Sequence, residues 1–332
     1  NLTDHSIDHV DNLWRLASLI LGDNYPINPL EGYILGCSFL VHDSILSYEA
    51  FGGKDTLRNT IEWKDCYQDI IGTVYDNEEG KHKIDFKVIR QLNEKNCSNI
   101  LFRQFAGIDN SSHYLLTDDE MRNHYGQLIG EIASSHHWET DKILNLPSQV
   151  NGLASFPSNW IICPRKLACI LRCADAIAID SRRAPDYLFH LLHLNGVSRD
   201  HWIAQNRLGV ALDVNEPTRI VITSTNDFEE KDFSAWNVAY DAVQVINEEL
   251  EKCSFLLPEQ ERFQVKSVAG ANSRKALSEY IKTRGWEPSD VNVHISDVAH
   301  LIMTLGGKEL YGKDDLQLIV LRDRKSTRLN SS

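Results

Sequence analysis

The chain has 332 residues, of which 42% are hydrophobic and 24% are charged, and its formal net charge is −13. A chain of this size can bury a sizeable core, and its length suggests two or more domains. Its negative charge repels phosphate polymers, so duplex nucleic acid is not an expected partner, whereas a local positive pocket for one small phosphate ligand is allowed. No apolar run approaches the roughly 20 residues that span a bilayer, and there is no signal-peptide pattern. We therefore expect a cytoplasmic protein.

The seven cysteines fit the same compartment. Their number is odd and no two are spaced as Cys-x-x-Cys, which is typical of reduced thiols. Cys169 and Cys173 lie four residues apart on an expected helix, next to Asp175. We interpret these two cysteines as small core residues and not as metal ligands.

Two apolar helices are predicted near the N-terminus, and each carries a histidine inward. The first follows a predicted cap at Thr3-Asp4 and places His9 on its apolar stripe, with His5 one turn earlier at the rim. The second follows a turn-rich break at 24–29 and ends on His42-Asp43, where core side chains would be expected. Burying these polar groups is costly unless something compensates them, and a divalent metal ion would do so. A structural His-Asp hydrogen bond is the alternative.

A third helix is predicted to start at Thr117-Asp118, where acidic residues favour a helix N-terminus. It carries His124 and then His136 and His137 near its end. A straight helix rises about 1.5 Å per residue, so His124 and His136 are expected to lie about 18 Å apart. The two cannot bind the same ion unless the helix bends.

A fourth helix opens at Pro164 and places Asp175 within a stripe of Leu and Ala. An accidental buried carboxylate is rare. Asp175 is therefore interpreted as a metal ligand or as the partner of Arg172 or Arg182 in a buried salt bridge. Arg182 and Arg183 lie at the end of the helix, where a guanidinium group could bind an anion by paired hydrogen bonds.

The pattern changes after about residue 194. The predicted fold class is mainly α, with a helical bundle over residues 1–190 followed by a small α/β subdomain over 191–268. The polar segment 76–83 is expected to be a solvated loop. In the second part the predicted elements are strands at 208–214, 219–225, 263–268 and 291–295 and helices at 232–255, 273–283 and 297–305.

The order His, His-Asp, His, Asp on four apolar helices resembles the HD superfamily of metal-dependent phosphohydrolases, over roughly residues 1–190. By this resemblance His9 matches the first family histidine, His42 and Asp43 match the signature dyad, and Asp175 matches the closing aspartate. The resemblance implies that these four residues bind a divalent metal ion, whether Mn, Fe, Mg, Zn or Ni. The dyad is followed by Ser44-Ile45, where many members have a small residue and Gly.

The same resemblance suggests the catalytic groups. His124, His136 and His137 match positions where members place a catalytic histidine or ligands of a second metal ion. We expect one of them to be a general acid or an anion-stabilising group, and Arg182 or Arg183 to hold a phosphate by paired hydrogen bonds. The implied substrate is a small phosphorylated compound such as a nucleotide.

The segment 305–322 resembles the lead-in to GHKL-type (chaperone-like) ATPase domains, and the chain departs from that pattern at Asp323. We therefore expect a fragment of a bacterial HD–ATPase fusion that ends before the ATPase core, with 269–322 as linker and lead-in and 323–332 as a non-native tail. The expected function is a phosphohydrolase coupled to that ATPase. The alternatives are a catalytically weak nucleotide-sensing module that controls the ATPase, and a purely structural helical bundle.

Overall fold

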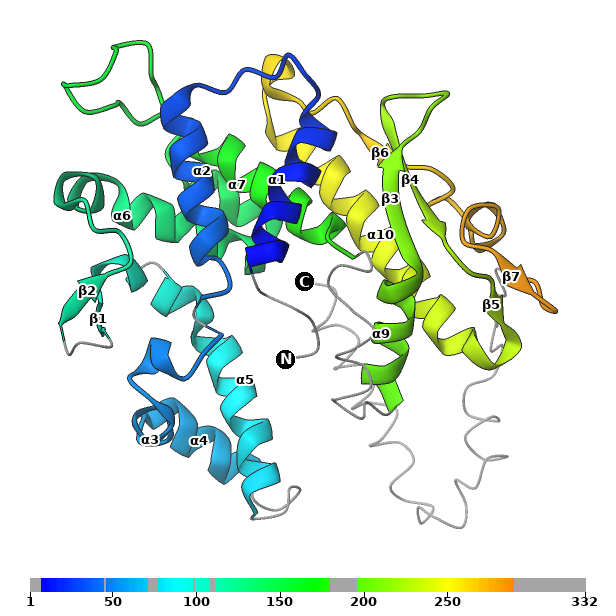
Figure 1. The fold of residues 1–332 in the computed structure, drawn as a ribbon, viewed down its shortest axis with the longest axis horizontal. Helices are drawn as coiled ribbons and strands as arrows, with labels where there is room; N and C mark the ends of the chain where they lie inside the picture. Colours follow the sequence, from blue (N-terminus) through cyan, green and yellow to red (C-terminus); the bar gives the residue numbers. More distant parts are fainter. Residues whose placement is uncertain are drawn as a thin grey trace, which may run out of the picture. The chain divides into compact units, whose positions relative to one another are not determined.

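Helices make up most of the structure, as the sequence predicted. The computed structural model, drawn in Figure 1, describes the residue ranges 7–44, 46–70, 77–97, 99–107, 111–179 and 196–289. Residues 1–288 form one compact unit. Within the described ranges no helix is both long enough and apolar enough to cross a membrane. The predicted cap at Thr3-Asp4, Arg182 and all elements predicted beyond residue 290 lie outside these ranges, and the predicted domain borders stay a prediction.

The predicted site lies in a bundle built from α1 (Ile7–Leu21), α2 (Pro29–Val41), α6 (Asp119–Ser134), α7 (Pro164–Ile177) and α10 (Phe233–Leu256). Helix α7 contacts each of the other four (Figure 1). Most of its residues are buried, including Cys169 and Cys173, as expected for small core residues. A helix buried on nearly all sides is typical of a core position, so α7 is the central helix of the bundle.

The start of α2 is fixed to α7 by a buried ion pair. Asn28 caps α2 and forms a capping box with Glu31. Glu31 is 1% exposed and accepts hydrogen bonds from the Lys166 ammonium at 2.8 Å and from the Cys163 backbone N–H at 2.9 Å. Lys166 also donates to the Pro26 carbonyl at 2.8 Å. These contacts set the position of α2, and therefore of the residues at its far end.

A second group of helices consists of α3 (Lys54–Arg58), α4 (Ile61–Ile70) and α5 (Glu78–Cys97). Its polar centre is Asp85, which is 1% exposed. The Asp85 carboxylate accepts from Arg58 Nη2, from the Tyr48 hydroxyl and from Trp63 Nε1, each at 2.8 Å. A buried carboxylate with this many donors is fully satisfied, so we assign it a structural role.

The predicted solvated loop at 76–83 is wrong for its last six residues. Helix α5 begins at Glu78, so residues 78–83 are helical. The Asn77 side chain accepts from the Gly80 backbone N–H at 2.8 Å, and its carbonyl accepts from the Lys81 N–H at 3.0 Å. Asn77 therefore acts as a helix cap, and the high charge of the segment had hidden this local signal.

Short elements connect the helices. A hairpin that the sequence did not predict joins β1 (Gln104–Ala106) to β2 (Ser112–Tyr114), with Phe105 opposite His113. The 3-10 helix η3 (Ser135–His137) is one turn long, follows α6 directly and carries His136 and His137. The other 3-10 helices of this part are η1 (Glu49–Phe51), η2 (Ile100–Phe102) and η4 (Thr140–Asn145).

The α/β part follows at α9 (Gly196–Arg207), which packs on α10. Its sheet has the order β3 (Leu208–Leu212), β4 (Arg219–Ser224), β6 (Ser267–Val268), antiparallel between β3 and β4 and parallel between β4 and β6. The first two strands and the long helix α10 match their predicted ranges. Of the predicted strand 263–268 only the last two residues form β6, and of the predicted helix 273–283 only four residues are α-helical. The remaining elements among the described residues are β5 (Phe228–Glu229), η6 (Glu230–Asp232), η7 (Glu259–Glu261), α11 (Arg274–Leu277) and β7 (Thr283–Arg284).

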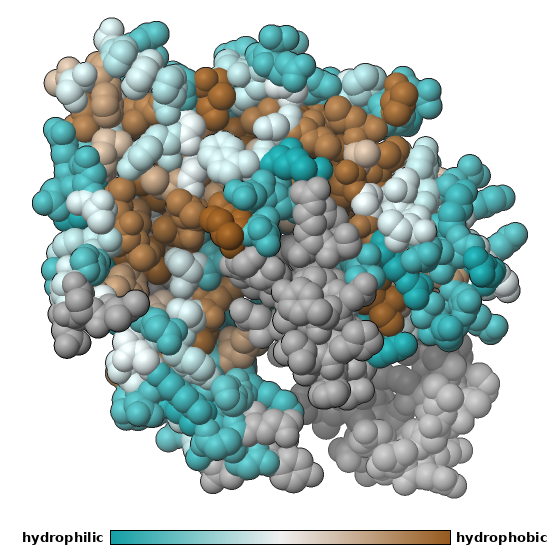
Figure 2. All heavy atoms as spheres, viewed as in Figure 1, coloured by the Kyte–Doolittle hydropathy of each residue, from teal (hydrophilic) through white to brown (hydrophobic). Residues whose placement is uncertain are grey.

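The visible surface differs between the two groups of helices. Figure 2 shows hydrophilic residues over the end formed by α3, α4 and the start of α5, and apolar residues over α2 and α6. On α2, Leu40 is 57% exposed, although its neighbours Phe39 and Val41 are buried. Single exposed apolar residues of this kind are common on soluble proteins, so they define no site here.

Candidate metal centre

Helix α1 delivers His9 to the interior. Its buried residues recur at helical spacing and include His9, Leu13, Leu16 and Ile20. His9 is 3% exposed although it lies in the first turn of the described helix. The inward-facing histidine predicted from the apolar stripe is therefore present.

His42 follows the last residue of α2 and is 1% exposed. Its Nδ1 lies 2.7 Å from the Phe39 carbonyl oxygen. A carbonyl only accepts, so Nδ1 carries a proton, and Nε2 has a lone pair for a metal ion whenever the ring is neutral. This is the tautomer in which a backbone carbonyl commonly orients a metal-binding histidine. Nε2 points at the next residue, Asp43, whose Oδ2 lies 3.0 Å away.

Side chains from α1, the end of α2 and α7 converge at this point. One donor atom each of His9, His42 and Asp175 lies within 4.8 Å of the other two. The two imidazole Nε2 atoms are 3.4 Å apart, and His9 Nε2 is 3.6 Å from Asp175 Oδ1. Asp43 Oδ2 is 3.8 Å from His9 Nε2. Ligands at about 2.0–2.2 Å from one ion lie about 3.0–3.5 Å from each other when they are adjacent. The 3.4 Å separation falls within this range, and the other two, together with the 3.9 Å between His42 Nε2 and Asp175 Oδ1, exceed it by a few tenths of an ångström. Small movements of the side chains would therefore bring these donors to one cation.

The electrostatics of the cluster favour a positive charge. Burial alone lowers the pKa of His42, but the hydrogen bond with Asp43 and the charges of Asp43 and Asp175 outweigh burial and raise it. The two carboxylates are 13% and 21% exposed, so water screens them only in part. Imidazole nitrogens and carboxylate oxygens are ligands of first-row divalent metals. The donor set therefore fits such an ion.

One alternative for Asp175 is wrong. All guanidinium nitrogens of Arg172 bond to other groups, and its ion pair is with Glu249 of α10 at 2.7 Å. Arg172 is therefore not the salt-bridge partner of Asp175. The second candidate partner, Arg182, lies outside the described residues.

His136 and His137 lie in different environments. The His136 side chain is 4% exposed, its ring centroid is 5.2 Å from that of His42, and its Nε2 is 3.9 Å from Asp43 Oδ1. That Nε2 has no hydrogen-bond partner among the described residues. Nδ1 donates to the Ala133 carbonyl at 2.5 Å. Burial lowers the pKa of His136 to about 4, so its ring is neutral at pH 7. His137 is exposed beside it, with ring centroids 3.8 Å apart.

The structure does not bring His124 into the cluster. His124 is exposed on α6 and contacts the ring of its neighbour Tyr125. It lies 12 residues before His136, about 18 Å along a straight helix. Sequence reasoning, in turn, left Arg172 open as a partner of Asp175 and missed Glu249, because nothing local marks a contact across 77 residues of chain.

Comparisons with known proteins agree with this geometry. The family model of HD-CE matches residues 1–252, which include every residue of the cluster. A search of curated proteins gave no match, and a search of solved structures gave none either. The family match covers most of the chain and coincides with a His, His, Asp group that could bind a metal ion. The chain therefore belongs to the HD-CE family.

Proposed function

We propose that the protein is a metal-dependent phosphohydrolase that acts on a nucleotide or another phosphoester. The observation that carries the proposal is the convergence of two buried histidines with Asp175 from separate helices, and with Asp43 beside them. In this proposal His9, His42, Asp43 and Asp175 hold one divalent ion. When bound, such an ion polarises a phosphoryl oxygen and lowers the pKa of a coordinated water.

The chain's own residues supply the remaining groups. His136 donates from Nδ1 to the Ala133 carbonyl, so its Nε2 presents a lone pair toward the Asp43 carboxylate region. We propose that Nε2 accepts a hydrogen bond from a water molecule between the two side chains and orients it. Exposed His137 lies on the outer side, where a phosphate can reach it. The roles of His124 as a catalytic group and of Arg182 as a phosphate-binding group stay predictions.

We further propose that this activity is coupled to a GHKL-type ATPase domain in the complete protein. The support for this coupling is the likeness of the segment 305–322 to the lead-in of such domains. The ATPase rate of the complete protein, measured as ADP formation in the unmodified protein and in Asp175→Ala, would test it. An ATPase rate that is the same in both proteins, with the magnesium concentration held constant, would contradict the coupling.

The test of the main proposal compares three proteins: the unmodified chain, Asp175→Ala and Asp141→Ala. Asp141 lies on η4 and contributes nothing to the cluster, so it is the matched control. Metal content by mass spectrometry and phosphate release from a panel of nucleotides are measured for each protein. We expect metal and turnover in the unmodified chain and in Asp141→Ala, and the loss of both in Asp175→Ala.

The outcomes separate the alternatives. Metal without turnover would favour the nucleotide-sensing module over the enzyme. An unmodified chain that retains no metal after incubation with Mn²⁺, Fe²⁺, Mg²⁺, Zn²⁺ or Ni²⁺ would contradict both proposals and favour the purely structural bundle.

A further inference from the structure

The turn that carries His136 is held in place by one arginine of another helix. η3 is a single 3-10 turn without a side-chain hydrogen bond at its N-cap, and so short an element has little stability of its own. Arg172 on α7 donates from Nη1 to the carbonyl oxygen of Ser135 and, at 2.6 Å, to that of Trp138. These two carbonyls flank the His136-His137 dipeptide. One guanidinium nitrogen therefore spans the turn.

The other donors of Arg172 are also used. Glu249 on α10 accepts from Nε at 2.9 Å and from Nη2 at 2.7 Å, and Thr140 Oγ1 lies 3.5 Å from Nη2. With the two carbonyls, these acceptors account for the five N–H groups that a guanidinium presents in one plane. Arg172 is 6% exposed, and the paired carboxylate compensates its charge away from water. We call Arg172 and Glu249 the clamp.

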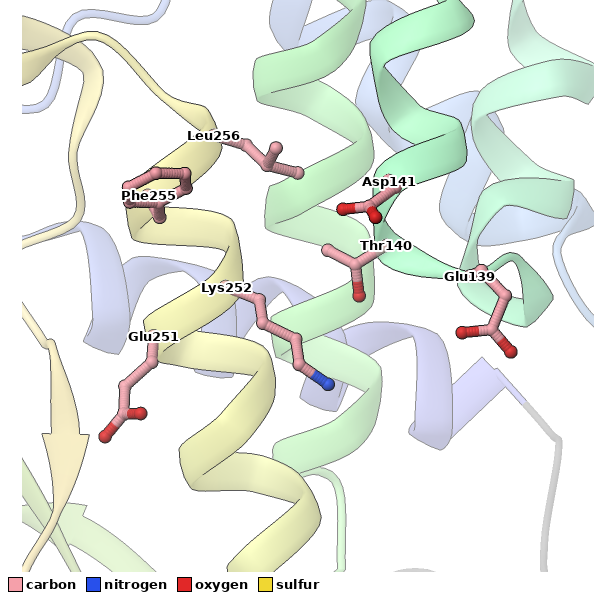
Figure 3. Close-up of a pocket in the computed structure, with 7 residues that line it drawn as sticks. All are labelled: Glu139, Thr140, Asp141, Glu251, Lys252, Phe255 and Leu256. Atoms are coloured by element: carbon pink, nitrogen blue, oxygen red, sulfur yellow. The ribbon is translucent and has the colours of Figure 1, made fainter. Parts of the chain in front are cut away.

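The clamp connects the turn both to the cluster and to α10. Arg172 precedes Asp175 by three residues on α7, so one helix carries both the clamp and a carboxylate of the cluster. Beyond Thr140, η4 and α10 face each other across a cavity of about 460 Å³ (Figure 3). Side chains do not fill this space, and Arg172, which donates to Thr140 of η4 and to Glu249 of α10, connects the two elements through α7. The cavity is lined by Glu139, Thr140, Asp141, Glu251, Lys252, Phe255 and Leu256.

We propose that Arg172, oriented by Glu249, is a positioning residue that holds the His136 ring in its place against Asp43. Its effect on turnover rests on the proposed phosphohydrolase function, whereas its effect on the His136 ring does not. Without the planar fork, η3 is free to shift, and His136 Nε2 moves from its present 3.9 Å separation from Asp43 Oδ1. Lysine cannot replace the fork, because an ammonium offers three donors from one point.

Arg165 provides a matched control on the same helix. It lies two turns before Arg172 and also donates to two carbonyls, from Nε to Leu146 at 2.9 Å and from Nη2 to Leu144 at 2.8 Å. Both acceptors belong to the end of η4 and not to the turn of His136. Arg165→Lys therefore removes a similar carbonyl contact without touching η3.

The experiment uses the full chain loaded with Mn²⁺ and compares Arg172→Lys, Glu249→Gln, their combination and Arg165→Lys. Hydrolysis of bis(p-nitrophenyl) phosphate gives kcat and KM, mass spectrometry gives bound Mn²⁺, and ¹H–¹⁵N NMR of the metal-free protein gives the ring signals of His136, assigned with His136→Asn. We expect each clamp variant to keep its Mn²⁺ and KM while kcat falls about ten- to a hundredfold, because misplacement by about 1 Å is costly. The His136 ring signals shift as well. The double variant is no worse than Arg172→Lys, since the two residues act as a unit, and Arg165→Lys changes nothing.

Two results would overturn the proposal. One is an Arg172→Lys protein with unchanged His136 ring signals, and the other is a clamp variant that loses Mn²⁺ in proportion to its activity, which would make the clamp a general support of the metal centre. If the unmodified chain hydrolyses no phosphoester, the proposed function fails and the ring signals alone decide the positioning role. If Arg172→Lys does not fold, as judged by circular dichroism, Glu249→Gln decides, because it keeps the guanidinium and both carbonyl acceptors.

Discussion

Replacing Lys166 by methionine is expected to lower the free energy of unfolding by about 3–5 kcal/mol, because it leaves the buried Glu31 carboxylate without its cation. Lys166 is 3% exposed and Glu31 is 1% exposed, so water cannot compensate either charge. Methionine matches the length of the lysine stem, so the substitution opens no large cavity and the electrostatic loss dominates. The two hydrogen bonds that the ammonium donates, to Glu31 and to the Pro26 carbonyl, are lost as well.

The double variant Glu31→Gln, Lys166→Met separates the charge from the helix cap. Glutamine keeps the capping box at the start of α2 with its one oxygen, but its NH2 group then faces the Cys163 N–H, which had bonded to the second carboxylate oxygen. The neutral pair is therefore expected to recover part of the loss and to stay about 1–3 kcal/mol below the unmodified chain. Urea unfolding followed by circular dichroism gives both numbers, with the slope of the transition checked for constancy. A single variant within about 1 kcal/mol of the unmodified chain would show that the pair contributes little, and the reasoning from burial would be wrong.

Chelating the metal from the loaded protein is expected to lower its free energy of unfolding by about 2.7 kcal/mol if the free ion had stood at about 100 times Kd. Asp175→Ala should show no such effect, and an equal effect in both proteins would point to a different metal site. A pH titration of stability tests the Asp85 network: burial tends to raise the pKa of Asp85, but the hydrogen bonds from Arg58, Tyr48 and Trp63 outweigh it and lower the pKa. The stabilisation is therefore present above the unfolded pKa of about 3.9 and lost as the pH falls through the lower folded pKa. Urea unfolding at pH 7, 5 and 3 gives the free energy of unfolding of the unmodified chain and of Asp85→Asn. The difference between the two proteins should shrink only at pH 3, and a difference that stays constant would contradict the low pKa of Asp85.

The helices of the bundle could be predicted because their signals are local. An apolar stripe at helical spacing depends on residues within a few turns, and α1, α6 and α10 lie where that pattern placed them. The short strands carry no such signal. β6 has two residues and exists only because β4 lies beside it, so its length is set by tertiary contacts.

The inward direction of the cluster residues followed from the same local reasoning, whereas their convergence on one point was implied by the resemblance to the HD superfamily. Each of His9, His42 and Asp175 interrupts an apolar face, and a polar group in such a place needs a partner. The sequence did not show which of His136 and His137 points inward. They are adjacent, and the direction of each depends on how far α6 continues before η3 begins. That end is fixed by Arg172, whose position is set by another part of the chain.

The clamp shows where sequence reasoning ends for this protein. Arg172 precedes Asp175 by three residues, which made an ion pair between the two a reasonable prediction. The guanidinium turns instead to Glu249, 77 residues later, and in that orientation two carbonyls and a threonine hydroxyl accept from its remaining donors. If Asp175 had accepted from Arg172, its carboxylate would have been neutralised and would bind a cation poorly. In the proposed metal centre, the pairing with Glu249 means that Arg172 does not compete with the cation for Asp175.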